Sequence, residues 1–420
     1  MQILVIGSGG REHALAWKLA QEAEVICAPG NPGMRSDVDT RVVDVGDPGA
    51  VIELAKESGA DLVVIGPEDP LIAGLADHLR GEGLLVFGPG ADWAQLEGSK
   101  AFSKSLMADL KIPTAEFESF TVWSHAADYA RKVYGSGGQL AVKASGTALG
   151  KGVTVADSLE QALDAIDRMM VKREFGCAGD TVVLEERLIG QEFSLLTLIG
   201  ERNYVSLPVA QDHKRAFDGD EGPNTGGMGT YSPCDWVTPD LIKETEAKMV
   251  EPIFRAVMER GGLYRGSLFT GVMMTPSGPK CLEYNVRLGD PETQTVMARL
   301  GPGFAEAVRA TAAGEKIPAL GALDNAAVTV VIASGGYPGS YRKGLPISLP
   351  TNVNGTKLFF AGVAGSPGNL VTGGGRVLGV TGIGATLQEA RASAYATAEQ
   401  VRFEGAFYRS DIGKSQCGLR

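Results

Sequence analysis

Residues 1 to about 90 alternate between short apolar runs and longer amphipathic stretches. The apolar runs are rich in Val, Ile and Leu and have the length of buried strands; they lie at 3–6, 24–28, 61–65 and 84–87. Helices are predicted between these strands, near 11–22, 49–58 and 70–80. Buried strands that alternate with helices indicate a parallel sheet with crossover connections.

The pattern changes from about residue 100. Ser99 is placed to cap a helix over 100–110. A smaller α+β module follows over roughly 114–187, and a further module begins near 325. The predicted strands of these parts lie at 139–143, 181–185, 191–198, 265–274, 280–286, 327–333 and 376–381, and the predicted helices at 158–171 and 386–402. We expect 211–233, which is rich in Gly, Asp and Asn, to be a long functional loop.

Composition narrows the class of protein. A chain of 420 residues predicts two to four domains, and its 57 glycines are about twice the usual share. The net charge of −11, without a basic patch, gives no indication of a nucleic-acid partner. Five scattered cysteines fit a reducing compartment. No apolar run has the length of a membrane span, and no signal peptide is expected, so we predict a cytoplasmic protein without a membrane partner.

The first glycine-rich segment, Gly7-Ser-Gly-Gly-Arg-Glu-His13, follows a strand and opens a helix. Backbone N–H groups at such a position can bind phosphate or carboxylate. A nicotinamide-dinucleotide fingerprint is disfavoured, because Glu12 occupies the position of the third glycine and no acidic residue ends the second strand. Two readings stay open: a phosphate or small-anion site, and a tight turn without a ligand.

The second glycine-rich segment lies between Lys143 and Val153. It is not a P-loop, because Gly146 to Gly150 is one residue too short and a strand-like sequence follows. A strand, a glycine-rich turn and a second strand form a flap that can close over a triphosphate, with Lys143 and Lys151 supplying positive charge. The alternative is a solvated hairpin with ordinary surface lysines.

Glu283 and Asn285 lie two positions apart on a predicted strand, so their side chains share a face, and Arg287 continues it. Mg²⁺ prefers hard oxygen ligands and commonly takes one or two protein groups together with substrate phosphates. The pair therefore predicts a magnesium site, while a solvated polar face is the alternative. The Arg287 guanidinium suits the capture of a carboxylate or phosphate.

Taken together, these segments resemble the ATP-grasp ligases, and within them the glycinamide ribonucleotide synthetase family of purine biosynthesis. The resemblance covers essentially the whole chain, and Arg287-Leu-Gly-Asp-Pro-Glu292 is its most specific block. The other matching blocks are Gly7–His13, Gly66–Glu68, Glu97–Lys100, Gly150–Val153, Asn224–Gly229 and Ser334–Pro338. It implies a multidomain α/β and α+β protein: a Rossmann-like (pre-ATP-grasp) domain over 1–100, an ATP-grasp domain over 101–320 with a lid subdomain at 114–187, and a small C-terminal domain over 321–420.

The resemblance also implies the reaction. Members join glycine to 5-phosphoribosylamine and convert ATP to ADP and phosphate through an acyl phosphate, with Mg²⁺ or Mn²⁺. Catalysis then rests on positioning and charge neutralisation, without an enzyme nucleophile. We expect small-molecule partners only, and a monomer or weak dimer.

Site residues follow from the same resemblance. ATP is expected to contact Lys100, Lys143, Gly150, Lys151, Gly152, Glu185, Glu186, Leu188 and Glu192. The expected metal ligands are Glu283 and Asn285. The expected substrate-binding residues are Gly9, Gly10, Glu68, Asp212, Lys214 and Arg287. The expected catalytic residues are Arg287, Lys143 and Asp290.

Three residues depart from the family pattern. Leu288 replaces a usual Phe, Ser145 stands where the flap commonly has Asp, and Phe360 stands where the C-terminal module usually has His. Because of Phe360, no catalytic role is assigned to that module. Two other hypotheses stay open: an ATP-grasp enzyme acting on a different carboxylate, and a nicotinamide oxidoreductase built on the N-terminal domain.

Overall fold

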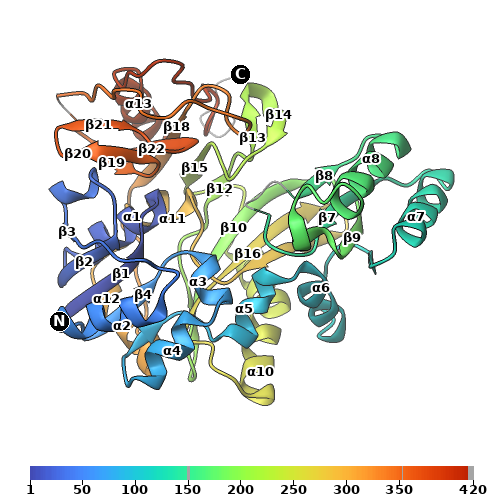
Figure 1. Cartoon of the computed structure of the whole chain (residues 1–420), viewed down its shortest axis with the longest axis horizontal. Helices are drawn as coiled ribbons and strands as arrows, with labels where there is room; N and C mark the ends of the chain where they lie inside the picture. Colours follow the sequence, from blue (N-terminus) through green and yellow to red (C-terminus); the bar gives the residue numbers. More distant parts are fainter. Residues whose placement is uncertain (149–151, 352, 415–420) are drawn as a thin grey trace.

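The N-terminal module is a parallel sheet with strand order β3-β2-β1-β4-β5 in the computed structural model, which describes residues 1–148, 152–351 and 353–414 (Figure 1). Its strands are β1 (Gln2–Gly7), β2 (Glu24–Pro29), β3 (Asp39–Thr40), β4 (Leu62–Ile65) and β5 (Val86–Phe87). Its helices are α1 (Gly10–Leu19), α2 (Pro48–Glu57), α3 (Glu68–Ile72) and α4 (Leu75–Gly81). The strand order reverses between β1 and β4, and a crevice forms at the carboxyl ends of strands at such a point.

One predicted helical stretch of this module is interrupted. The stretch 70–80 contains two helices, because Gly74 adopts a left-handed conformation with φ +85° between α3 and α4. Glycine is the residue that adopts this conformation without a steric penalty. Helix α3 begins at Glu68, two residues after Gly66 and close behind β4, and α4 begins directly after Gly74.

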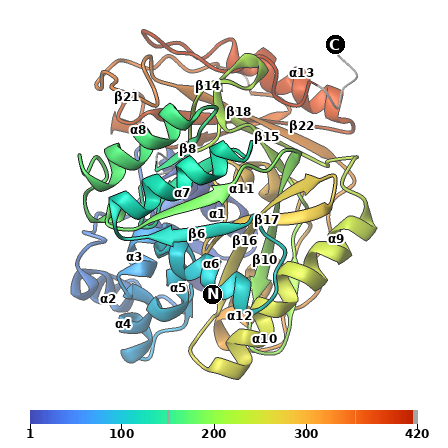
Figure 2. The same cartoon turned by 90° about the vertical axis from the view of Figure 1, so that its right-hand side faces the viewer.

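The 114–187 subdomain has its own antiparallel sheet and its own apolar core. The strand order is β6-β9-β7-β8, with β6 (Phe117–Phe120), β7 (Leu140–Ala144), β8 (Val153–Val155) and β9 (Val182–Glu186). Helices α7 (Trp123–Gly135) and α8 (Leu159–Met170) pack side by side against it (Figure 2). The two strands predicted on either side of the flap are present as the antiparallel pair β7 and β8, while residues 149–151 between them lie outside the described residues.

A second antiparallel sheet, in the order β11-β10-β16-β17, forms the middle of the molecule. Its strands are β10 (Gln191–Ile199), β11 (Tyr204–Ser206), β16 (Gly266–Thr275) and β17 (Gly278–Asn285). The helices of this region are α5 (Ala91–Gly98), α6 (Lys100–Asp109), α9 (Pro239–Thr245), α10 (Glu251–Arg260), α11 (Glu292–Met297) and α12 (Phe304–Ala313). The Ser99 cap is confirmed, since the Phe102 N–H donates to its hydroxyl at 3.2 Å.

The C-terminal sheet has the order β12-β15-β18-β22-β19, and helix α13 (Leu387–Ala398) packs on it. Its strands are β12 (Gln211–Asp212), β15 (Gly229–Ser232), β18 (Ala326–Ala333), β19 (Thr356–Phe360) and β22 (Arg376–Gly384). Two hairpins accompany it, β13 (Arg215–Phe217) with β14 (Glu221–Asn224), and β20 (Val363–Ser366) with β21 (Asn369–Thr372). The predicted loop at 211–233 was therefore wrong: it contains four short strands, two of which join this sheet.

The arrangement sets the 114–187 subdomain apart from the N-terminal and C-terminal modules. In Figure 1 it projects at the right, while the other two modules lie one above the other at the left and the central sheet connects them. Within the described ranges, every helix is too short or too polar to cross a bilayer.

Candidate active site

A cleft of about 290 Å³ lies where the 114–187 subdomain meets the central sheet and the N-terminal module. It is lined by most of the predicted site residues, namely Glu68, Lys100, Lys143, Gly152, Glu185, Glu186, Leu188, Glu192, Asp212, Lys214, Glu283, Asn285, Arg287 and Asp290. Gly9 and Gly10 are not among the lining residues. Gly150 and Lys151 lie outside the described residues. Residues far apart in the chain are thus brought to one place.

Lysine side chains gather on the side of the cleft formed by α6 and β7. Lys143 Nζ and Lys104 Nζ each lie 2.9 Å from the same Glu185 carboxylate oxygen. Burial acts to lower the pKa of Lys143, but Glu185 and Glu283 together outweigh it and the pKa is raised, so the ammonium stays charged. Lys104 was not predicted, although it follows Lys100 by one helical turn and therefore shares its face of α6.

Glu185 carries an unsatisfied acceptor. Its side chain is 2% exposed, and its Oε1 has no hydrogen-bond partner among the described residues. A buried acceptor without a partner costs free energy unless a ligand or water supplies a donor. The position of this oxygen in the cleft lining therefore favours a ligand that carries a hydrogen-bond donor.

Strand β17 presents Glu283 and Asn285 to the cleft, and the hydroxyl of the intervening Tyr284 donates to Met249 O at 2.7 Å. Burial acts to raise the pKa of Glu283, but Lys214, Lys143 and Lys100 outweigh it and lower the pKa. A charged carboxylate beside an amide oxygen fits Mg²⁺ when phosphates complete the coordination. The described residues contain no group of three or more His, Cys, Asp or Glu able to hold a metal alone.

The Arg287 guanidinium contacts two carboxylates of the protein. Arg287 Nε donates to Glu68 Oε2 at 3.1 Å, and Nη2 lies 2.8 Å from Glu97 Oε1. Arg11 Nη1 also reaches Glu68 Oε2, at 3.5 Å. From the sequence, Arg287 was predicted to bind a substrate anion, and no role was predicted for Glu97 or Arg11. The binding role of Arg287 stays a prediction.

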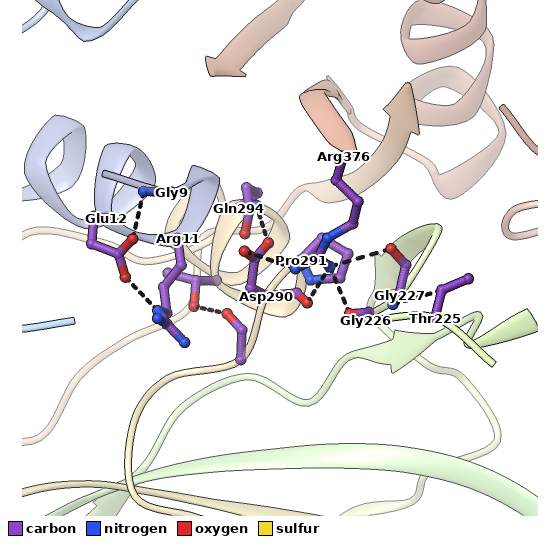
Figure 3. Close-up of polar contacts among 12 residues, drawn as sticks. Gly9, Arg11, Glu12, Thr225, Gly226, Gly227, Asp290, Pro291, Gln294 and Arg376 are labelled. Atoms are coloured by element: carbon purple, nitrogen blue, oxygen red, sulfur yellow. Dashed lines mark hydrogen bonds and ion pairs between the residues drawn. The ribbon is translucent and has the colours of Figure 1, made fainter. Parts of the chain in front are cut away.

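Glu12 fills the space formed by the first glycine segment. The Gly9 N–H donates to Glu12 Oε2 at 2.7 Å, and Arg11 Nε lies 2.5 Å from Glu12 Oε1 (Figure 3). A Cβ at Gly7 or Gly66 would overlap the Glu12 side chain. The Gly9 N–H is thus bonded to a side chain of the same helix, and the predicted phosphate or small-anion site stays a prediction. The predicted substrate contacts of Gly9 and Gly10 stay a prediction.

The C-terminal sheet contributes Arg376 to the edge of the cleft. Its Nη2 lies 3.0 Å from Asp290 Oδ2, and its Nη1 donates to Asp290 O at 2.7 Å and Gly226 O at 2.6 Å (Figure 3). Gln294 Nε2 donates to Asp290 Oδ1 at 2.8 Å. No catalytic role was assigned to this module from the sequence, and its part in substrate binding was left open; in the structure Arg376 contacts Asp290 and Gly226, which both line the cleft.

Asp212 and Lys214 form another charged pair in the cleft, with 3.2 Å between Nζ and Oδ2. Burial raises the pKa of Asp212, and Asp212 in turn raises the pKa of Lys214. Lys214 thus faces the cleft as a cation, opposite the carboxylate of Glu283 that it helps to keep ionised.

Comparison with known families accounts for nearly the whole chain. The phosphoribosylglycinamide synthetase models match it in three consecutive parts: the N domain over 1–97, the ATP-grasp (A) domain over 98–293 and the C domain over 327–415. The chain belongs to the phosphoribosylglycinamide synthetase family. The predicted resemblance and the ATP-grasp fold are therefore confirmed, whereas the exact domain boundaries stay a prediction.

Relatives in this family match along their full length. The chain is 48% identical to a phosphoribosylamine–glycine ligase of Agrobacterium fabrum over 98% of each chain. It is 44% identical to one of Halalkalibacterium halodurans, over 100% of this chain and 98% of the relative. The crystal structure of the phosphoribosylamine–glycine ligase of Thermotoga maritima superposes with a TM-score of 0.86 and 37% identity, covering 98% of this chain and 100% of that one.

A more distant structure shares the fold alone. The biotin carboxylase domain of a Hydrogenobacter thermophilus 2-oxoglutarate carboxylase, solved with MgADP and bicarbonate, has a TM-score of 0.73 at 15% identity. It covers 97% of this chain, and this chain covers 91% of it. Because the chain belongs to the phosphoribosylglycinamide synthetase family and has this fold, the nicotinamide oxidoreductase hypothesis has no support.

The departures from the phosphoribosylglycinamide synthetase pattern have structural roles. Leu288 is buried in the core at 2% exposure. The Ser145 hydroxyl accepts from Ala101 N at 3.0 Å, in the first turn of α6. Phe360 stacks on His13, and its N–H donates to His13 Nδ1 at 2.9 Å. Two of the three also contact predicted site residues through the backbone, since the Lys100 N–H donates to Ser145 O at 2.7 Å and Arg287 Nη1 donates to Leu288 O at 3.4 Å.

Proposed function

We propose that this protein joins 5-phosphoribosylamine to glycine with conversion of ATP to ADP and phosphate. The observation that carries the proposal is the full-length family match combined with one cleft that contains both the lysines and the Glu283–Asn285 pair. Ligation of this kind needs a nucleotide, a carboxylate and an amine held together, and the cleft is lined from three modules of the chain.

The reaction proceeds through glycyl phosphate. A glycine carboxylate oxygen attacks the γ-phosphorus of ATP, the bond to the bridging oxygen breaks, and ADP leaves. The nitrogen of phosphoribosylamine then attacks the acyl carbon, phosphate departs with the original carboxylate oxygen, and the nitrogen loses a proton. Both steps form highly charged transition states, so positioned cations supply most of the stabilisation.

The lysines and the hinge between β9 and β10 hold ATP. Lys100 and Lys143 face the phosphates, with Gly150, Lys151 and Gly152 in the closing flap. Glu185, Glu186 and Leu188 meet the adenine, and Glu192 meets the ribose. The unpartnered Glu185 Oε1 supports this assignment, because the adenine amino group is a hydrogen-bond donor.

Glu283 and Asn285 hold Mg²⁺, for which Mn²⁺ substitutes. The metal neutralises phosphate charge when bound. Asp212, Lys214, Arg287 and Asp290 orient glycine and the amine, and Glu68, Gly9 and Gly10 lie at the phosphoribosylamine end. We place the enzyme in the cytoplasm, as a monomer or weak dimer.

The decisive experiment measures ADP and phosphate release with ATP, glycine and phosphoribosylamine, omitting each in turn. Release that needs all three supports the proposal. Turnover without glycine, or formation of AMP and pyrophosphate, overturns it. A panel of other carboxylates separates it from another ATP-grasp activity. Glycine labelled with oxygen-18 in its carboxylate tests the intermediate: one labelled oxygen must appear in phosphate, and its absence rejects glycyl phosphate.

A further inference from the structure

The two carboxylates that contact Arg287 differ in burial and in their second partners. The Glu97 side chain is 9% exposed and the Glu68 side chain 24% exposed. Glu68 Oε2 is shared between Arg287 and Arg11. An ion pair closer to solvent is easier to break than a buried one, because water compensates the separated charges. The Glu68 contact is therefore the exchangeable one.

Both carboxylate oxygens of Glu97 contact the same short segment of chain, Val286 and Arg287. Oε1 lies 2.8 Å from Arg287 Nη2, and Oε2 accepts from the Val286 N–H at 2.8 Å. Val286 directly follows β17, which ends at Asn285. A single side chain on α5 thus fixes both the guanidinium and the backbone next to the predicted metal ligands.

The Arg287 guanidinium is bonded to several groups of the protein itself. Besides the two carboxylates, its Nη1 lies 3.4 Å from Leu288 O. These contacts engage three of the five guanidinium N–H groups, so a substrate anion that binds on the Glu68 or the Glu97 side takes the place of that carboxylate. Replacing Glu97 would free the Val286 N–H as well, whereas replacing Glu68 leaves that carboxylate with Arg11.

We propose that Glu97 is a positioning residue that anchors Arg287 and the end of β17, while Glu68 is the partner that Arg287 exchanges for a substrate anion. The inference rests on the proposed ligase function. Glu97 touches no reacting atom. It acts by holding the guanidinium at one position relative to Glu283 and Asn285, so that the carboxylate to be phosphorylated is aligned with the nucleotide.

The test compares three variants at pH 8. Glu97→Gln keeps the size of the side chain and removes the charge, Glu97→Asp keeps the charge at shorter reach, and Asp92→Asn removes an exposed charge from the same helix as a control. We expect Glu97→Gln to lower kcat at least tenfold while the Kd for ATP changes less than twofold. Glu97→Asp should recover part of kcat, and Asp92→Asn should match the wild type.

Glu68→Gln supplies the contrast. It removes the charge that the substrate anion must displace from Arg287, so it should lower the KM for glycine or phosphoribosylamine, with a smaller change in kcat than Glu97→Gln. Circular dichroism and thermal unfolding establish that each variant is folded. An unchanged kcat in Glu97→Gln, or the same kinetic pattern in both variants, overturns the inference. A wild type that forms no glycine-dependent ADP overturns the proposed function instead, so the two failures are distinguishable.

Discussion

Arg376 and Asp290 connect the C-terminal sheet to the turn that follows β17, with 3.0 Å between Nη2 and Oδ2. The same guanidinium binds the backbone carbonyls of Asp290 and Gly226. Three chain segments meet at one planar donor group, and its geometry allows several parallel hydrogen bonds. The C-terminal module therefore helps to shape the cleft.

Replacement of Arg376 should impair catalysis. We expect Arg376→Gln to lower kcat/KM by about a hundredfold, because the turn bearing Asp290 and the loop at Gly226 lose their common partner. Arg376→Lys should recover little, since one ammonium cannot replace the fork of donors. Steady-state kinetics measure the effect, and Arg342→Gln, at an exposed position, is the matched control. Wild-type kcat/KM in Arg376→Gln would contradict the prediction.

Loss of the Glu283 charge should reduce turnover by orders of magnitude without unfolding the protein. The carboxylate is ionised and surrounded by lysines, so its neutral isostere Glu283→Gln weakens the site for Mg²⁺. Activity is titrated with Mg²⁺ for the wild type, this variant and Glu259→Gln, whose side chain is exposed on α10. An unchanged magnesium dependence in Glu283→Gln would reject the ligand assignment.

Glu97 should make stability depend on pH. Burial raises its pKa to about 7, although Arg287 opposes the change. The folded protein thus keeps this proton to a higher pH than the unfolded chain. The contribution of the protonated Glu97 carboxyl to the free energy of unfolding is complete below about pH 4.5. It is lost as pH rises through 7. Between pH 5 and pH 8, the free energy of unfolding of Glu97→Gln should therefore rise by on the order of 3 kcal/mol relative to that of the wild type. Denaturant unfolding at both values measures this, and a constant difference would contradict it.

Nucleotide binding should protect the 114–187 subdomain. Its separate apolar core and its projection from the other modules allow it to move as a unit over ATP. We expect slower amide hydrogen exchange in β7, β8 and β9 when a non-hydrolysable ATP analogue is present. Strands β20 and β21 of the C-terminal module serve as the internal reference. Identical exchange in the subdomain with and without nucleotide would count against lid motion.

Gly66→Ala should displace Glu12, because the new Cβ would overlap its carboxylate. We expect a loss of about 1–3 kcal/mol in the free energy of unfolding, the usual cost of overpacking. Gly81→Ala is the control, since its Cβ would meet nothing within 4 Å. Adding Glu12→Ala should make the effect of Gly66→Ala smaller than in the wild type, as expected for neighbours. If the losses in the free energy of unfolding of the two single variants were simply additive, Glu12 would not be the side chain that fills the space beside Gly66.

Local patterns in the chain were enough to predict most strands and several helices. Buried β strands such as β1 and β10 are runs of apolar residues, and α6 has a recognisable cap at Ser99. The short strands within 211–233 were missed because they carry many polar residues and Gly. Strand β15 pairs with β18, which lies about a hundred residues further along the chain, and β12 pairs in turn with β15, whereas β13 and β14 pair with each other.

The sequence by itself determined the family, the order of the modules and the residue types that line the cleft, because these are carried by contiguous blocks such as Arg287–Glu292. Only the tertiary structure decided which charges meet. Glu97 and Arg287, and likewise Arg376 and Asp290, are separated by distances along the chain that no local pattern records. A charged side chain in a buried site takes the partner that packing brings nearest, and that partner is set by the fold.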